Sequence, residues 1–138
     1  MKNKIGINFW IIVIGLTIAF ASCSKGEGKG GGATIQGKIL RQDYVTGTIK
    51  DGAEYPGADE RVYLIYGNGT VYSEDFDASY DGSYEFKNLR TGNYKVFVYS
   101  DIVPKPAEPP YEEAVIKSIT ISDKKGVVEA ETITVKRY

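Results

Sequence analysis

The chain has 138 residues, with 17 basic and 18 acidic side chains, a single cysteine and no histidine. This near-neutral balance provides no basic footprint for nucleic acid or for anionic lipid over the chain as a whole, so nucleic-acid binding is not expected. The lack of histidine removes the most common general base near neutral pH and the most common metal ligand. One cysteine allows no internal disulfide, so the folded part must be stabilised by burial.

The first 23 residues have the layout of a secretory signal. Lys2 and Lys4 precede an apolar run from Ile5 to Phe20, and the small residues Ala21 and Ser22 stand directly before Cys23. A basic start, an apolar middle and small residues at the cleavage point are typical of such signals. The run is shorter than the ~20 apolar residues that span a bilayer, although an uncleaved membrane helix and a plain signal peptide remain alternatives.

A cysteine directly after the small residues makes this segment resemble a bacterial lipoprotein signal. Phe20 stands where enteric signals prefer a Leu-like residue, which resembles the looser pattern of Bacteroidota. The resemblance implies that residues 1–22 are removed and that Cys23 is the site of lipid attachment. Ser24 is not the aspartate that retains enteric lipoproteins in the inner membrane. The implied location is therefore the outer membrane, on either its periplasmic or its surface face.

Residues 23–33 are predicted to be the lipidated cysteine and a flexible linker. Ser24 to Gly32 reads SKGEGKGGG, which contains five glycines and no apolar side chain. Glycine loses the most conformational freedom on ordering, and no burial is available to offset that cost. The folded domain is therefore expected to cover residues 34–138.

From residue 34 the sequence predicts strands and turns, because no window longer than about ten residues keeps apolar positions at helical spacing. Turn signals lie at Gly67-Asn68-Gly69, at Asp81-Gly82 and at the stretch from Leu89 to Gly92. The resulting prediction is an all-β, seven-stranded antiparallel β-sandwich. Its strands are expected at 34–40, 61–66, 70–76, 83–86, 93–100, 114–121 and 127–136.

Alternation along these strands predicts which side chains form the core. The positions expected on the inner face are Val62, Leu64, Tyr94, Val96, Val98, Ile119, Ile121, Ile133 and Val135. Two strands are also apolar on the opposite face, at Tyr63, Ile65, Phe97 and Tyr99. Either loops cover these strands, or the outer face carries an aromatic patch; tyrosine as an ordinary strand residue is the third interpretation.

The stretch from Asp77 to Val96 reads DASYDGSYEFKNLRTGNYKV. It resembles the signature of carboxypeptidase regulatory-like and Cna-B-type domains, roughly D-G-x-Y-x-F-x-x-L-x-x-G-x-Y-x-V. The resemblance implies a prealbumin-like (transthyretin-like) Greek-key sandwich over nearly all of residues 34–136. It places turns at Gly82 and Gly92, and it implies that Tyr84, Phe86, Leu89 and Tyr94 lie in the core. These modules serve as spacers, adhesin stalks and accessory domains, so no ligand is implied.

One acidic cluster stands out, formed by Glu74, Asp75, Asp77 and Asp81. Closely spaced carboxylates are the ligands that calcium prefers, but their spacing does not match an EF-hand loop. They are interpreted as solvated turn carboxylates, with calcium binding between Asp75 and Asp81 left open. No metal site and no cofactor is predicted.

The sequence offers no catalytic constellation. There is no histidine, no cysteine other than Cys23, no G-x-S-x-G motif and no metal-ligand cluster. The protein is therefore predicted not to be an enzyme, with no catalytic residues and with unknown binding residues. The leading hypothesis is an envelope lipoprotein that binds or positions a protein or glycan partner at the outer membrane. The alternative is an accessory subunit, such as an adhesin or pilus stalk or a transporter partner, recruited by strand addition. The proline-rich stretch from Ile102 to Tyr111 is a further candidate recognition loop.

Overall fold

The structure is a computed structural model that describes residues 25–46, 49–102 and 111–138. These residues form nine strands and no helix. The strands are β1 (Lys29–Thr46), β2 (Ile49–Pro56), β3 (Arg61–Tyr66), β4 (Glu74–Asp77), β5 (Ser83–Leu89), β6 (Gly92–Asp101), β7 (Glu112–Ile121), β8 (Lys125–Glu129) and β9 (Ile133–Arg137). Cys23, the predicted signal segment and residues 103–110 of the proline-rich loop lie outside the described residues.

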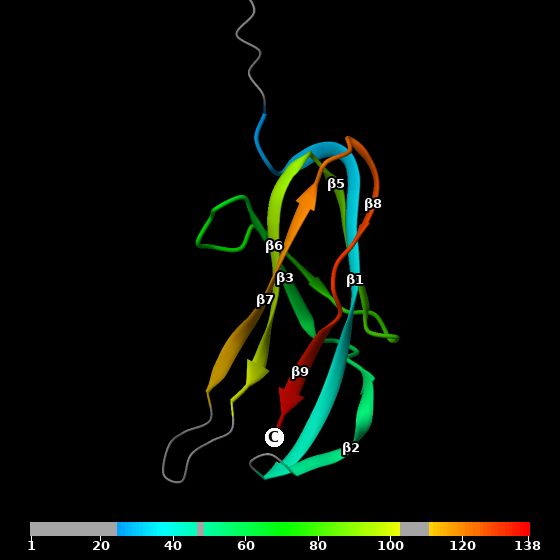
Figure 1. The fold of residues 1–138 in the computed structure, drawn as a ribbon, viewed down its shortest axis with the longest axis vertical. Coiled ribbons are helices and arrows are strands. Elements are labelled where there is room, and N and C mark those ends of the chain that lie inside the picture. The colour runs from blue at the N-terminus through cyan, green and yellow to red at the C-terminus, as the bar shows by residue number, and fades with distance from the viewer. Residues whose placement is uncertain (1–24, 47–48, 103–110) are drawn as a thin grey trace, which may run out of the picture.

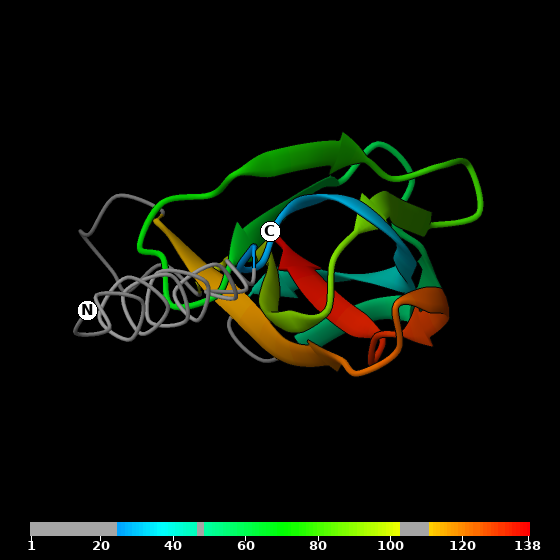
Figure 2. The same ribbon diagram turned by 90° about the horizontal axis from the view of Figure 1, so that it is seen from above.

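The strands form two sheets that enclose a common interior (Figures 1 and 2). One sheet has the order β4-β3-β6-β7, and all its pairs are antiparallel. The other is built around β1, which pairs with β2, β5, β8 and β9. The prediction of an all-β sandwich is confirmed at this level. Within the described part of the chain, no helix is long and apolar enough to cross a lipid bilayer.

β1 runs from one end of the molecule to the other (Figure 1). Its first half pairs antiparallel with β5 and parallel with β8, and its second half pairs antiparallel with β2 and parallel with β9. The wholly antiparallel sheet predicted from the sequence is therefore wrong for this layer. The parallel pairs arise because the chain leaves β7 in one sheet and enters β8 in the other, beside β1 and in the same direction.

The strand number was also underestimated. β2 lies in a stretch expected to be a loop, and all eight of its side chains are exposed, so no burial alternation marks it in the sequence. The strand expected at 127–136 is divided into β8 and β9, where the Ala130 amide donates to the Gln36 carbonyl of β1 at 2.8 Å. The strand expected at 70–76 is reduced to β4.

The predicted linker is ordered from its middle onward, because β1 already begins at Lys29. The glycines here permit close packing. A Cβ on Gly31 would lie 1.9 Å from the Leu89 carbonyl oxygen, so only glycine fits against β5 at this point. Burial of backbone against β5 and β8 offsets the entropy cost that had suggested a flexible linker. The ordered domain thus begins before residue 34.

The core matches the predicted inner faces. All nine positions expected from alternation are at most 7% exposed, and Tyr84, Phe86 and Leu89 are at most 2% exposed. Both predicted turn glycines have positive φ angles, 76° at Gly82 and 143° at Gly92.

Candidate functional site

The outer side of the β4-β3-β6-β7 sheet carries a cluster of four aromatic rings. We call it the aromatic face and define it as Tyr63 on β3, Phe97 and Tyr99 on β6, and Tyr72 from the loop between β3 and β4. Side chains of β3 and β6 alternate between the two sides of the sheet, so the neighbours Val62, Val96 and Val98 point into the core. The structure combines two of the interpretations left open by the sequence. Ile65 and Phe97 are buried, at 8% and 7% exposure, under a loop whose Tyr72 packs on Tyr63, whereas Tyr99 remains 41% exposed on the outer side.

Tyr63 is the centre of the aromatic face. Its ring stacks on Phe97 with centroids 4.8 Å apart and an interplanar angle of 15°. Tyr72 tilts against Tyr63 at 4.8 Å, and Tyr99 meets it edge-on at 5.6 Å. Such stacked and edge-to-face pairs favour a fixed arrangement of rings. The aromatic face is therefore a preformed surface of packed rings.

The rings differ in how much of each one solvent reaches. Phe97 is only 7% exposed, whereas Tyr72 is 51% and Tyr99 is 41% exposed. Partial burial raises the pKa of the Tyr63 hydroxyl, so it stays protonated near neutral pH. On the adjacent edge strand, Ile116 pairs with Phe97 and is 53% exposed. Two tyrosines and one isoleucine thus offer accessible surface around a buried phenylalanine.

A charged rim borders the rings. Arg61 of β3 donates two hydrogen bonds to Asp77, from Nε to Oδ1 at 2.7 Å and from Nη2 to Oδ2 at 2.9 Å. Its Nη1 lies 3.4 Å from Asp75 Oδ2. The hydrogen bond to Asp77 raises the pKa of Arg61, so the guanidinium group stays protonated. The rim therefore holds planar donors and acceptors beside the aromatic surface.

A hollow of about 160 Å³ opens at one end of the aromatic face. Tyr63 and Tyr99 form its aromatic wall, Val98 also lines it, and four charged side chains complete the lining, namely Glu60, Arg61, Glu112 and Arg137. It is smaller than the ~300–1,000 Å³ pockets that enclose drug-sized ligands. It therefore suits one unit of a larger ligand that continues over the rings.

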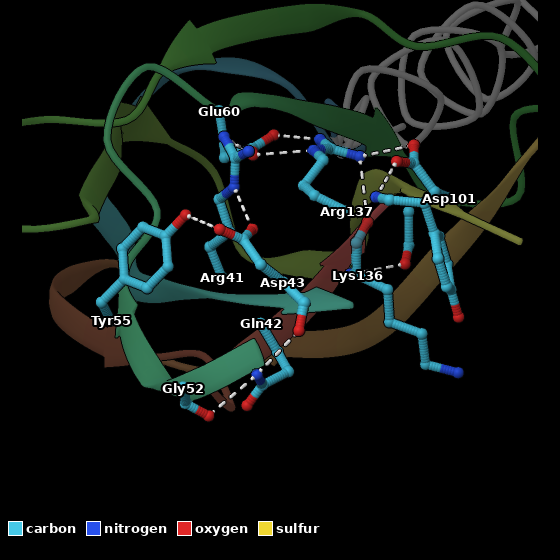
Figure 3. Close-up of polar contacts among 11 residues, drawn as sticks. Arg41, Gln42, Asp43, Gly52, Tyr55, Glu60, Asp101, Lys136 and Arg137 are labelled. Carbon is cyan, nitrogen blue, oxygen red and sulfur yellow. Dashed lines mark hydrogen bonds and ion pairs between the residues drawn. The ribbon is translucent and has the colours of Figure 1, made fainter. Parts of the chain in front are cut away.

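Two charged residues of this lining, Glu60 and Arg137, belong to a network of ion pairs (Figure 3). Arg137 of β9 binds Glu60 through Nε, at 3.1 Å from Oε1, and through Nη2. Its Nη1 donates to Asp101 Oδ1 at 3.1 Å. Burial alone would lower the pKa of Arg137, but the hydrogen bond to Glu60 and the nearby carboxylates outweigh it, so the pKa is raised.

The network continues toward β2. Arg41 Nη1 lies 4.0 Å from Glu60 Oε1, and Arg41 Nε donates to Asp43 Oδ1 at 2.9 Å. The Tyr55 hydroxyl donates to Asp43 Oδ2 at 2.7 Å, and these two bonds lower the pKa of Asp43. Glu60, at 7% exposure, is compensated by two arginines from distant strands. This arrangement joins β9, β6 and β1 around the base of the hollow.

The acidic cluster singled out in the sequence does not converge on one point. Asp75 and Asp77 bind Arg61, Glu74 pairs with Lys29 at 2.6 Å, and Asp81 accepts from the Ser83 hydroxyl at 2.6 Å. Among residues 25–46, 49–102 and 111–138, no group of three His, Cys, Asp or Glu side chains is placed to hold a metal ion.

A second, larger hollow of about 390 Å³ lies over β1 and β5. Its charged and amide groups are already paired, since Lys38 contacts Asp81 at 3.4 Å, Glu85 binds Lys87 at 2.6 Å and Gln36 donates to Glu129. Its aromatic lining, Phe76 and Tyr84, belongs mainly to the core. It therefore offers a ligand less accessible aromatic surface than the aromatic face does.

No protein-family model matches the chain, and no curated protein matches it. Among solved structures it is similar to a protein of Pseudomonas aeruginosa that is described as a proposed carbohydrate-binding protein. The two chains share 16% identity with a TM-score of 0.48, over 80% of this chain and 91% of the other. This similarity is too distant to transfer a ligand.

Proposed function

We propose that the protein is a non-catalytic cell-envelope lipoprotein, anchored at the outer membrane through Cys23, whose aromatic face binds a glycan. The single observation that carries the binding role is the preformed cluster of rings with Tyr72 and Tyr99 exposed at 51% and 41% beside a charged rim. The sequence signal supports the anchor. The lack of histidine and of any cysteine beyond residue 23 supports a role without catalysis.

The chemistry of the aromatic face suits a sugar. A pyranose presents C–H groups on its faces, which stack on aromatic rings, and hydroxyl groups at its edge, which need charged or polar partners. The aromatic face offers both within one surface, through Tyr99 and the Arg61–Asp77 pair.

The charges of the rim favour a neutral glycan. Around the hollow and the rings, the two guanidinium groups of Arg61 and Arg137 stand against four carboxylates, those of Glu60, Asp75, Asp77 and Glu112. Each guanidinium is already bound to a carboxylate. An acidic sugar would meet a surface with excess negative charge, so uronic-acid polymers should bind more weakly than neutral polysaccharides.

Recruitment by strand addition is the second hypothesis, and β7 is the long edge strand that it would use. Lys117 lies on the core-facing side of β7, between Val115 and Ile119, and binds Glu131 at 2.6 Å. An inward-facing charge on an edge strand opposes pairing with another strand. The structure thus gives more support to binding through the aromatic face.

The test of the binding role is affinity electrophoresis of the detergent-solubilised protein in gels containing a neutral glucan, a mannan or a polyuronate. Tyr99→Ala and Tyr72→Ala should each weaken retardation by a neutral polysaccharide about tenfold, because a stacked ring contributes roughly 1–1.5 kcal/mol. Tyr80→Ala is the matched control, since Tyr80 is 96% exposed in the turn before β5. Equal behaviour of Tyr99→Ala and Tyr80→Ala would exclude the aromatic face as a glycan site.

The test of the anchor is separate. Wild-type protein should incorporate labelled fatty acid and partition into detergent, and Cys23→Ala should abolish the labelling. Wild-type protein that is water-soluble with a free thiol at residue 23 would show that the lipid anchor is wrong while leaving the glycan test intact.

A further inference from the structure

The predicted linker is docked on one end of the sandwich. This end, which we call the anchor end, is formed by residues 25–32, 88–93 and 122–126, at the top of Figure 1. Arg90 Nε donates to the Gly26 carbonyl at 2.8 Å, and the Arg90 amide donates to the Gly28 carbonyl at 2.9 Å. The Gly28 amide donates to the Tyr94 hydroxyl at 3.0 Å, which in turn donates to the Arg90 carbonyl at 2.7 Å.

The anchor end is therefore close to the attachment residue along the chain. Gly26, the first residue with a fixed contact, is three positions after Cys23. Three residues span at most about 10 Å even when fully extended, which is about one Debye length at physiological salt. With Cys23 lipidated, charges at this end would lie within electrostatic reach of the headgroups.

The charge of the anchor end matches such a surface. It carries five basic side chains and two carboxylates, Lys25, Lys29, Arg90, Lys124 and Lys125 against Glu27 and Asp123. The charge of Lys29 is offset by Glu74 of β4, which lies 2.6 Å away, so the excess positive charge comes from the other four bases. Lys25, Lys124 and Lys125 are exposed, and none of the three has an ion-pair partner among the described residues. Lys124 and Lys125 are fixed beside the docked segment, because the Gly32 amide donates to the Lys124 carbonyl at 3.2 Å.

The opposite end carries the reverse charge. This far end, at the bottom of Figure 1, comprises residues 43–46, 49–55, 100–102, 111–113 and 136–138. Its six carboxylates, Asp43, Asp51, Glu54, Asp101, Glu112 and Glu113, stand against three bases, Lys50, Lys136 and Arg137. The sandwich is thus polarised along its length, and an anionic surface attracts one end and repels the other.

We infer that the anchor end binds the anionic headgroups of the phospholipid leaflet that holds the acyl chains, which sets the domain upright on the membrane with its aromatic face open to the side. This inference rests on the proposed anchor at Cys23. Basic side chains near an anionic leaflet each strengthen binding by about fivefold. The exposed Lys25, Lys124 and Lys125 would supply an electrostatic attraction to the membrane in addition to the insertion of the acyl chains.

The test uses full-length lipoprotein in vesicles. Because Cys23 is the only cysteine and is blocked by acylation, an introduced cysteine takes a fluorescent donor selectively. Ser122→Cys labels the anchor end and Glu54→Cys labels the far end, which β1 separates by up to about 60 Å. Energy transfer to an acceptor on lipid headgroups reports the distance of each label from the bilayer.

With vesicles containing phosphatidylglycerol, transfer from residue 122 should exceed transfer from residue 54 at least threefold. Lys124→Glu with Lys125→Glu, 0.5 M salt, or purely zwitterionic vesicles should reduce that ratio at least twofold. Lys50→Glu with Lys136→Glu is the matched control at the far end and should leave it unchanged. Equal transfer from both labels, or a ratio indifferent to lipid charge, would overturn the inference. Protein that fails to float with vesicles in 1 M salt would instead overturn the anchor on which it rests.

Discussion

Replacement of Gly31 by alanine should destabilise the fold strongly, although the sequence around it reads as a flexible linker. An added Cβ would lie 1.9 Å from the Leu89 carbonyl oxygen and 2.6 Å from the Arg90 Cα. These atoms belong to backbone, which no side-chain rotation relieves, so β1 must separate from β5 at this position. Ordinary contact requires about 1.5 Å of displacement.

The cost follows from what this displacement breaks. Two hydrogen bonds hold the Gly28 backbone, from the Arg90 amide to the Gly28 carbonyl at 2.9 Å and from the Gly28 amide to the Tyr94 hydroxyl at 3.0 Å, and each contributes about 0.5–1.5 kcal/mol. Partial exposure of Leu89, which is fully buried, forfeits part of the 1.5–3 kcal/mol that burial of such a side chain provides. Gly31→Ala should therefore lower the free energy of unfolding by about 2–4 kcal/mol.

Urea denaturation of the detergent-solubilised protein measures this loss. With an m-value of about 1–3 kcal/mol/M, the midpoint should fall by about 0.7–4 M. Gly26→Ala is the matched control, since a Cβ there meets nothing within 4 Å, and it should leave the midpoint unchanged or slightly raised. A midpoint for Gly31→Ala at or above that of wild type would refute the packing of residues 26–32 against β5.

Four further outcomes are expected. Tyr84→Phe should stabilise the protein by about 1 kcal/mol or leave its stability unchanged, because the buried Tyr84 hydroxyl has no hydrogen-bond partner among the described residues. Tyr94→Phe should instead cost about 2 kcal/mol, because it breaks two hydrogen bonds. Chemical denaturation of the two variants measures both effects. Burial raises the pKa of Tyr84 to about 12, above its ordinary value of about 10, so its contribution to stability is complete below pH 10 and is lost as pH rises through 12. The melting temperature of Tyr84→Phe should therefore fall less than that of the wild type as the pH rises from 10 to 12. Arg137→Ala should cost about 3–5 kcal/mol, because it leaves the Glu60 carboxylate buried without its main partner, and Arg137→Ala combined with Glu60→Gln should recover part of the loss. Chelator should not change the melting temperature, and a calcium-dependent rise of several degrees would show that the acidic cluster binds metal.

The inner faces of the sandwich could be predicted from the sequence because alternation in β3, β6, β7 and β9 is a local signal. Burial then follows directly from position in the strand. β2 gave no such signal, because it is held by hydrogen bonds to β1 while all its side chains face solvent. The parallel pairing of β8 and β9 depends on which sheet the chain enters after β7, and this is a non-local choice.

The candidate site was predictable in part. The sequence marks Tyr63, Phe97 and Tyr99 because they are apolar residues on the strand face opposite the predicted core. Tyr72 did not, because it was assigned to a strand and in fact reaches the aromatic face from a loop. The ion pair between Glu60 and Arg137 joins residues 77 positions apart, and no short-range sequence pattern predicts such a contact.

The parallel pairing of β1 with β8 and β9 also determines how the molecule would carry mechanical load. β1 begins at the anchor end, and β9 runs beside it in the same direction and finishes at the far end (Figure 1). A pull between the lipid and a ligand held near Arg137 would act along these strands. The hydrogen bonds of five residue pairs with β8 and five with β9 would then be sheared together, instead of opening one after another. If the protein is anchored through Cys23 and holds a glycan at the aromatic face, as proposed, the sandwich would resist extension along the line between the two.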